Sequence, residues 1–445
     1  MSADKSLTNV NLKILIFSII VGIVVGSAIV AYIKLTHFCI ELFFLGKSLE
    51  DINKLPLLYL ILVSTLGAIV VSLIKLHNEK IHEYGVAKVA RILEEGKLEI
   101  KVKDVISKIV ASALSIGSGF AVGNEGPSAE VGAMISYYLS KLVKIPVTLL
   151  KTVIAAGASA GIAAVFISPF TGFVFGLEVM VKELSITNSF VMVLASVFGF
   201  AISSHFLQQI DFPFFFQKSI FWQDIIYPIF MVPFIVLVSI VFLRVKDSIN
   251  YQIFYPLERK FMEIIRKYGI STKYKILSKA ILAGIFTGIL LKITPYSGFS
   301  GHSLIEKLIY ENKDIAFNLA LTILLARIIS TSVALSWGAV GGLFMPILTI
   351  GAILGYIYGI CIKEVFPNIY FPNSYFATIG AASFLGALLN VPTTAIILAF
   401  ELTLNFSIIV PTAVVTIFSL HFLLIYREFY AKYVERKYQN VSKEN

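Results

Sequence analysis

The chain has 445 residues, of which 57% are hydrophobic and only 14% are charged. Soluble globular domains carry about 25% charged residues, so this composition excludes an ordinary soluble protein and indicates an integral membrane protein. The formal net charge of +10 does not indicate a nucleic-acid binder, because the basic residues lie between the apolar runs and at the C-terminus. We therefore expect the lipid bilayer as a partner, and no nucleic acid.

Apolar runs recur along the chain, and each approaches the ~20 residues that a helix needs to cross the hydrocarbon. In chain order, clear examples are 15–32, 57–74, 220–243 and 319–335. The pattern predicts an all-α, polytopic protein of the cell (inner) membrane. The first run has no convincing small-residue cleavage site, so we expect it to be retained. The basic gaps 75–108 and 244–279 and the tail 427–443 are expected to face the cytoplasm, with both termini.

Two short motifs lie 219 residues apart, GNEGP (123–127) and GLFMP (342–346). Each has a glycine before a proline and then an apolar helical pattern, which is typical of a helix that begins with proline in its first turn. Two such helix starts that meet inside the membrane would present unpaired backbone N–H groups and the positive ends of two helix dipoles. This arrangement binds an anion without a full positive charge.

Glu125 is the acidic residue of the first motif. When ionised it would compete with an anion for these donors, and when protonated or displaced it would leave them. The sequence therefore predicts an anion site gated by Glu125. The alternative role for Glu125 is stabilisation of a helix N-terminus alone, and the alternative role for Asn124 is a turn cap.

A second repeated segment indicates that the chain consists of two related halves. The segments 156–178 and 379–401 align at a shift of 223 residues, and each is interrupted by a proline. The matched residues are Gly157 with Gly380, Pro169 with Pro392, and Glu178 with Glu401. Interrupted helices are tolerated in a bilayer only where protein buries them or where they line a cavity. Repeats of this kind are typical of secondary transporters. We expect the two glutamates to make structural hydrogen bonds.

The other class to consider is an intramembrane enzyme, which needs a nucleophile with a base or metal ligands at helical spacing. The six histidines are scattered without an H-E-x-x-H pair, and no G-x-S-x-G elbow occurs. Cys39 and Cys361 form no metal-ligand pattern, and we expect both to be buried thiols. The sequence thus favours a protein that is not an enzyme and that uses no metal or cofactor.

These motifs resemble those of the CLC family of chloride channels and proton-coupled chloride transporters. GNEGP is similar to the family's G-(K/R)-E-G-P motif and GLFMP to its G-x-F-x-P motif, and NVPTTAIILAFELTLNFSIIVP (390–411) resembles a late-helix segment. The resemblance implies an all-helical homodimer with one pathway per subunit for chloride or another halide. It implies that Glu125 is the external gating and proton-accepting residue. It also places Phe344 and the backbone of Gly342 and Leu343 at the anion site.

Some positions depart from the family pattern. EYGVAKV (83–89) stands where the family has G-S-G-I-P, so that Tyr84 replaces the serine, followed by Gly85 and Val86. Asn124 replaces the usual Lys or Arg. The two replacements together resemble a fluoride-exporting branch of the family. Fluoride/proton antiport is therefore an alternative to chloride transport.

Two further family positions concern proton coupling and the inner end of the anion site. Val179 stands where many proton-coupled members carry a second, internal glutamate. A family tyrosine that contacts the anion corresponds to Tyr430, or alternatively to Tyr426. Whether the protein is a channel or a proton antiporter stays open at this point.

The resemblance also divides the chain into domains. It implies a cytoplasmic N-terminal segment at 1–11 and a transmembrane domain at 12–433 that contains two repeats, approximately 12–215 and 216–433, which we expect to be inverted relative to each other. A short cytoplasmic tail is expected at 434–445, without the nucleotide-binding CBS domains of some relatives.

Overall fold

The computed structural model describes residues 12–78, 81, 101–181, 185–207, 222–268 and 275–444. The helices of the first half are α1 (Leu12–Phe43), α2 (Leu57–His77), α4 (Val102–Gly117), α5 (Glu125–Leu142), α6 (Leu150–Phe166), α7 (Pro169–Phe175) and α8 (Ile186–Phe206). Those of the second half are α9 (Gln223–Ile229), α10 (Val232–Ser248), α11 (Tyr255–Lys267), α12 (Lys275–Ile293), α13 (His302–Ile305), α14 (Phe317–Trp337), α15 (Phe344–Val365), α16 (Asn373–Leu389), α17 (Pro392–Thr403) and α18 (Ile409–Glu444).

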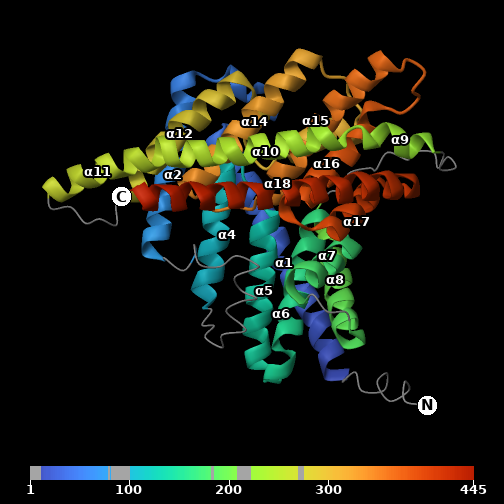
Figure 1. Ribbon diagram of the computed structural model, residues 1–445. Coiled ribbons are helices and arrows are strands. Elements are labelled where there is room, and N and C mark those ends of the chain that lie inside the picture. Colours follow the sequence, from blue (N-terminus) through green and yellow to red (C-terminus); the bar gives the residue numbers. More distant parts are fainter. Residues whose placement is uncertain are drawn as a thin grey trace.

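Nine helical segments of the described chain are long and apolar enough to cross a membrane. The predicted all-α, multi-pass class is therefore confirmed. In Figure 1, α5 to α8 lie in the lower half of the molecule, whereas α14 to α16 lie in the upper half. The repeated segments thus occupy separate regions that meet in the middle.

Close glycine contacts occur at matching places in the two halves. Gly132 of α5 lies against Gly157 of α6, and Gly351 of α15 lies against Gly380 of α16. A Cβ atom on any of these glycines would collide with the backbone of its partner helix. Small residues allow two membrane helices to approach this closely. Both halves therefore contain the same helix crossing.

The predicted helix interruptions are present in both halves. α6 ends at Phe166 and α7 begins at Pro169, and α16 ends at Leu389 and α17 begins at Pro392. One residue in each break has left-handed backbone, Ile167 with φ 53° and Asn390 with φ 59°. This conformation is unfavourable for a β-branched side chain such as that of Ile167, so the surrounding structure must hold it. Each break turns the chain sharply into a short helix that begins with proline.

Glu178 and Glu401 tie the two halves together. Each carboxylate accepts two backbone hydrogen bonds and one threonine hydroxyl at the start of the other half's short helix. The N–H donors are Phe170 and Thr171 for Glu401 (2.9 and 2.6 Å), and Thr393 and Thr394 for Glu178 (2.9 and 2.8 Å). A carboxylate there satisfies donors that lack helical partners and complements the helix dipole. The two glutamates make the expected structural hydrogen bonds, and these cross from one half to the other.

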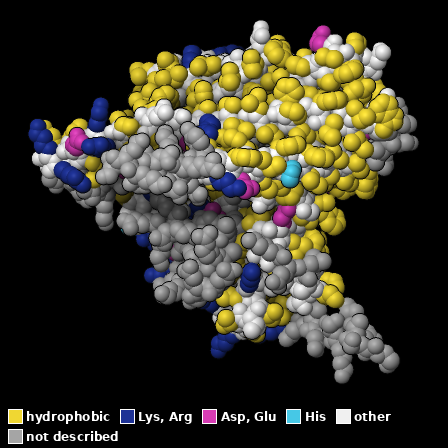
Figure 2. Space-filling view, viewed as in Figure 1, with side chains coloured by type: hydrophobic (Ala, Val, Ile, Leu, Met, Phe, Trp, Pro, Cys, Tyr) yellow, Lys and Arg dark blue, Asp and Glu magenta, His cyan; other side chains and the backbone are white. Residues whose placement is uncertain are grey.

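The outer surface carries many large apolar side chains. Figure 2 shows a broad hydrophobic face over the upper part of the molecule. Exposed apolar side chains of the described residues include Leu237 of α10 and Leu325 of α14, as expected of a protein in contact with lipid. The expectation that both cysteines are buried is wrong for Cys361, which is exposed, whereas Cys39 is buried. Cys361 shares an outward-facing stripe of α15 with the exposed Val365, four residues further on.

Candidate functional site

The helices α5 and α15 begin beside each other. Gly123 and Gly342, which precede the two helix starts, exchange backbone hydrogen bonds of 2.7 and 2.6 Å in an isolated antiparallel bridge. A Cβ on Gly126 would lie 2.8 Å from Cα of Gly342, so the approach requires glycine. The structure therefore brings together the two motifs that the sequence singled out, with the N-terminal ends of both helices at one place.

Glu125 reaches from the start of α5 to the start of α15. Its side chain is fully buried, and its Oε2 fills the space that a Cβ on Gly123 would occupy. That same space lies 3.1 Å from Cβ of Met345 and 3.2 Å from Cδ of Pro346, in the first turn of α15. The carboxylate thus lies between two helix N-termini, where an anion is favoured.

The carboxylate of Glu125 is poorly satisfied by hydrogen bonds. The backbone N–H groups of Glu125 itself and of Met345 face it. Within the described residues neither oxygen forms a hydrogen bond of standard geometry. Burial of an ionised group without full hydrogen bonding is energetically costly.

His302, at the start of α13, lies next to Glu125. Its Nε2 atom is 3.6 Å from Oε1 of Glu125, and 43% of the histidine side chain is exposed. The other ring nitrogen, Nδ1, forms a 2.8 Å hydrogen bond with Oγ of Ser300. Ser300 therefore fixes the ring so that Nε2 faces the carboxylate.

Arg327 of α14 holds the loop that carries His302. Its fully buried guanidinium donates to the carbonyl oxygens of Gly298 and Ser300, and its Nε donates to Oγ1 of Thr349 on α15 at 3.1 Å. Gly301 has φ 100°, and a Cβ there would collide with the Arg327 guanidinium. The loop is therefore packed closely against both α14 and α15.

A cavity of about 630 Å³ opens above this region. Its lining includes Asn124 and Met345 from the two helix starts, Phe166 from the end of α6, and His302. His37 and Lys47 line it as well. The Asn124 side chain does not cap α5, and its buried Oδ1 has no hydrogen-bond partner among the described residues. This geometry therefore does not favour the alternative that Asn124 is a turn cap.

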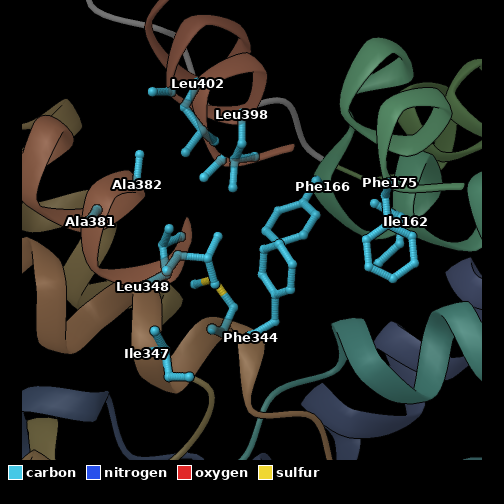
Figure 3. Close-up of a cluster of buried hydrophobic side chains, with 14 of the residues drawn as sticks. Ile162, Phe166, Phe175, Phe344, Ile347, Leu348, Ala381, Ala382, Leu398 and Leu402 are labelled. Atoms are coloured by element: carbon cyan, nitrogen blue, oxygen red, sulfur yellow. The ribbon is translucent and has the colours of Figure 1, made fainter. Parts of the chain in front are cut away.

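Phe344, the first residue of α15, is 5% exposed and packs into the core. Its ring centroid lies 5.2 Å from that of Phe166 and 6.4 Å from that of Phe175. Figure 3 shows these rings together with Leu348 and Leu398. The aromatic cluster joins the end of α6 to the start of α15 and forms an apolar wall beside the two helix starts.

Other residues singled out by the sequence lie elsewhere. Tyr84, Gly85 and Val86 lie outside the described residues. Tyr430 on α18 faces the guanidinium of Arg244, with the Cζ atom 3.8 Å from the ring centroid, and lines a different cavity of about 420 Å³. Tyr426 lines that same cavity. The structure thus groups Tyr430 with Arg244 of α10.

Four residues with ionisable side chains, Lys108, Glu130, His302 and Arg327, had no role assigned from the sequence. Glu130 of α5 forms a 2.7 Å ion pair with Lys108 of α4. Arg327 and His302 gather at Glu125 from positions about 200 residues away. The only sequence signal for His302 was its place in a glycine-containing segment, GFSGHS, between two apolar runs. That signal does not indicate a contact with Glu125.

Comparisons with known proteins agree with this architecture. Three solved structures share it: a slow cyanobacterial Cl-/H+ antiporter, a eukaryotic CLC transporter and a CLC-type fluoride/proton antiporter. They are 21%, 18% and 19% identical to the chain, with TM-scores of 0.77, 0.72 and 0.68. The alignments cover 92%, 93% and 95% of this chain and 94%, 72% and 96% of those chains, respectively. At these identities the likeness concerns the fold alone.

The sequence itself carries the family assignment. The family described as voltage gated chloride channel matches residues 66–423, which is most of the chain and includes both repeated motifs. The predicted resemblance is thereby confirmed. The chain belongs to the voltage gated chloride channel family, the CLC family of anion transport proteins.

Proposed function

We propose that the protein carries a halide, chloride by default, across the cell membrane and that Glu125 is the gate. The backbone N–H groups at the starts of α5 and α15 hold the anion, and ionised Glu125 occupies the same place when the anion is absent. Protonation removes the charge of Glu125 and releases it, so the anion can pass. The observation that carries this proposal is the buried carboxylate of Glu125 at the start of α15.

The remaining assignments belong to the same proposal. Gly342, Leu343 and Phe344 border the anion through their backbone, and Asn124 borders it from the cavity. We propose that the other end of the anion pathway is lined by Tyr430 and by the segment that contains Tyr84, Gly85 and Val86. The transmembrane domain, 12–433, forms a homodimer with one pathway in each subunit.

Fluoride/proton antiport is a second candidate, and one observation favours it. Asn124 stands in place of a cationic residue, and its side chain lines the cavity next to the two helix starts. An amide offers N–H donors without a full charge. Such donors suit a small, strongly hydrogen-bonding anion.

The test is anion efflux from liposomes that contain the purified protein. Chloride, fluoride and pH electrodes record wild type, Glu125→Gln and a matched control, Glu306→Gln, which removes another carboxylate that lines the cavity. We expect Glu125→Gln to pass the anion without proton movement or pH dependence, and the control to behave as wild type. An unchanged pH dependence in Glu125→Gln would overturn the gating role.

A further inference from the structure

We propose that His302 is the proton-exchange partner of Glu125 and makes the gate respond to the pH of the large cavity. This inference rests on the proposed function, because it needs Glu125 as the gate. The carboxylate of Glu125 is fully buried, whereas 43% of the His302 side chain is exposed, and the two groups lie 3.6 Å apart. His302 therefore contacts both the cavity and the gate.

The geometry suits proton transfer. The hydrogen bond between Ser300 and Nδ1 sets the ring orientation, and the contacts of Arg327 hold the loop beneath it. A small side-chain rotation would bring the two atoms from 3.6 Å to hydrogen-bond distance, as often happens when an acid–base pair engages. Within the described chain, His302 is the titratable side chain that has an ion-pair contact with Glu125.

Charged and titratable groups from several elements lie near His302 or line the cavity with it: His37 of α1, Lys47 after α1, Glu125 of α5, Arg327 of α14, and Glu306 one turn beyond His302. Partial burial, and after it the neighbouring His37 and Arg327, disfavour a lasting positive charge on the imidazole and lower its pKa. A proton that arrives at His302 is therefore passed on to the carboxylate of Glu125.

The transfer step is balanced. An imidazolium at His302 gives its Nε2 proton to Oε1 of Glu125, so that the N–H bond breaks, an O–H bond forms and the electron pair stays on Nε2. The ring is left neutral, with its remaining proton on Nδ1 and shared with Ser300. Neutral Glu125 then leaves the start of α15. A hydronium ion from the bathing solution returns a proton to Nε2, and the reverse sequence releases a proton to the cavity.

The test compares His302→Gln with wild type in the same liposomes, with the pH varied separately on each side. Loss of a positioned proton donor should slow proton movement by roughly tenfold or more. It should also flatten the dependence of flux on the pH of one side only. The matched control is His421→Gln, which removes an exposed histidine of α18 that is not among the lining residues of the cavity and should keep the wild-type pH profile. Ser300→Ala, which frees the ring, should give an intermediate profile.

A double variant separates this inference from the proposed function. His302→Gln should have no further effect in a Glu125→Gln background, because the histidine acts through that carboxylate. If Glu125→Gln abolishes the pH dependence but His302→Gln keeps a wild-type profile, the relay is overturned and the gate stands. If Glu125→Gln itself keeps the pH dependence, both fail. Preserved anion efflux in the His302 variant shows that it has folded.

Discussion

Gly123 and Gly342 hold the starts of α5 and α15 together through two reciprocal backbone hydrogen bonds. The main chains of the two halves therefore touch beside Glu125, and no side chain separates them. The width of the proposed anion site at this point is set by backbone geometry. A side chain added at one of these glycines would change the distance between the starts of α5 and α15.

The first prediction concerns that spacing. Gly126→Ala and Gly342→Ala should lower anion flux and thermal stability, because each added Cβ lies within 3.0 Å of backbone atoms of the other helix start. Overpacking of this kind costs about 1–3 kcal/mol. Flux in liposomes and melting of the purified protein measure the two effects. Gly46→Asn is the control, since nothing lies near that glycine and Asn tolerates its positive φ. Equal flux in all variants would contradict the close approach.

The second prediction concerns the carboxylates that join the halves. Glu401→Gln should destabilise the protein by about 1–2 kcal/mol, because hydrogen bonds to a charged group are replaced by weaker ones at the start of α7. Glu178→Gln should have a similar effect at α17. Thermal unfolding in detergent measures both. Glu428→Gln, at an exposed site on α18, should leave the melting temperature unchanged. A melting temperature for Glu401→Gln equal to that of this control would refute the structural role.

The third prediction concerns Arg327. Arg327→Lys keeps a positive charge but loses the fork that donates to Gly298, Ser300 and Thr349. We expect a loss of stability together with a weakened pH response, since the loop that carries His302 is no longer fixed. Melting temperature and the pH profile of flux are the two measurements. Arg259→Lys, on the exposed side of α11, is the matched control. A stable variant with a wild-type pH profile would show that the loop does not depend on Arg327.

The fourth prediction concerns the choice of anion. Asn124→Lys should lower the permeability of fluoride relative to chloride, because a full charge beside the two helix starts replaces a neutral hydrogen-bond donor. Electrode recordings of both anions give the ratio. Asn124→Gln retains the amide and should shift the ratio less. If the lysine variant keeps the wild-type ratio, Asn124 does not set selectivity.

The parts of the site that follow from local backbone requirements could be predicted from the sequence. Proline at a helix start and glycine before it are local features, so GNEGP and GLFMP predict two helix starts from the sequence alone. The glutamate of GNEGP is a local feature as well. The contact of His302 with Glu125, and the hydrogen bonds by which Arg327 holds the His302 loop, could not be predicted. No local pattern in the sequence indicates which loop packs over a helix start. The exposure of Cys361 could not be predicted either. An apolar helix tolerates lipid and protein on any side, so its pattern does not say which stripe faces outward.

The hydrogen bonds that the carboxylates of Glu178 and Glu401 accept have a consequence for assembly. Each half lacks the acid that completes its own short helix and supplies the one that its counterpart needs. A first half synthesised alone would leave the N–H groups of Phe170 and Thr171, at the start of α7, without the carboxylate of Glu401. The early helices therefore lack part of their final hydrogen bonding until α17, which carries Glu401, has been inserted. The later half acts as a partner that completes the folding of the earlier one.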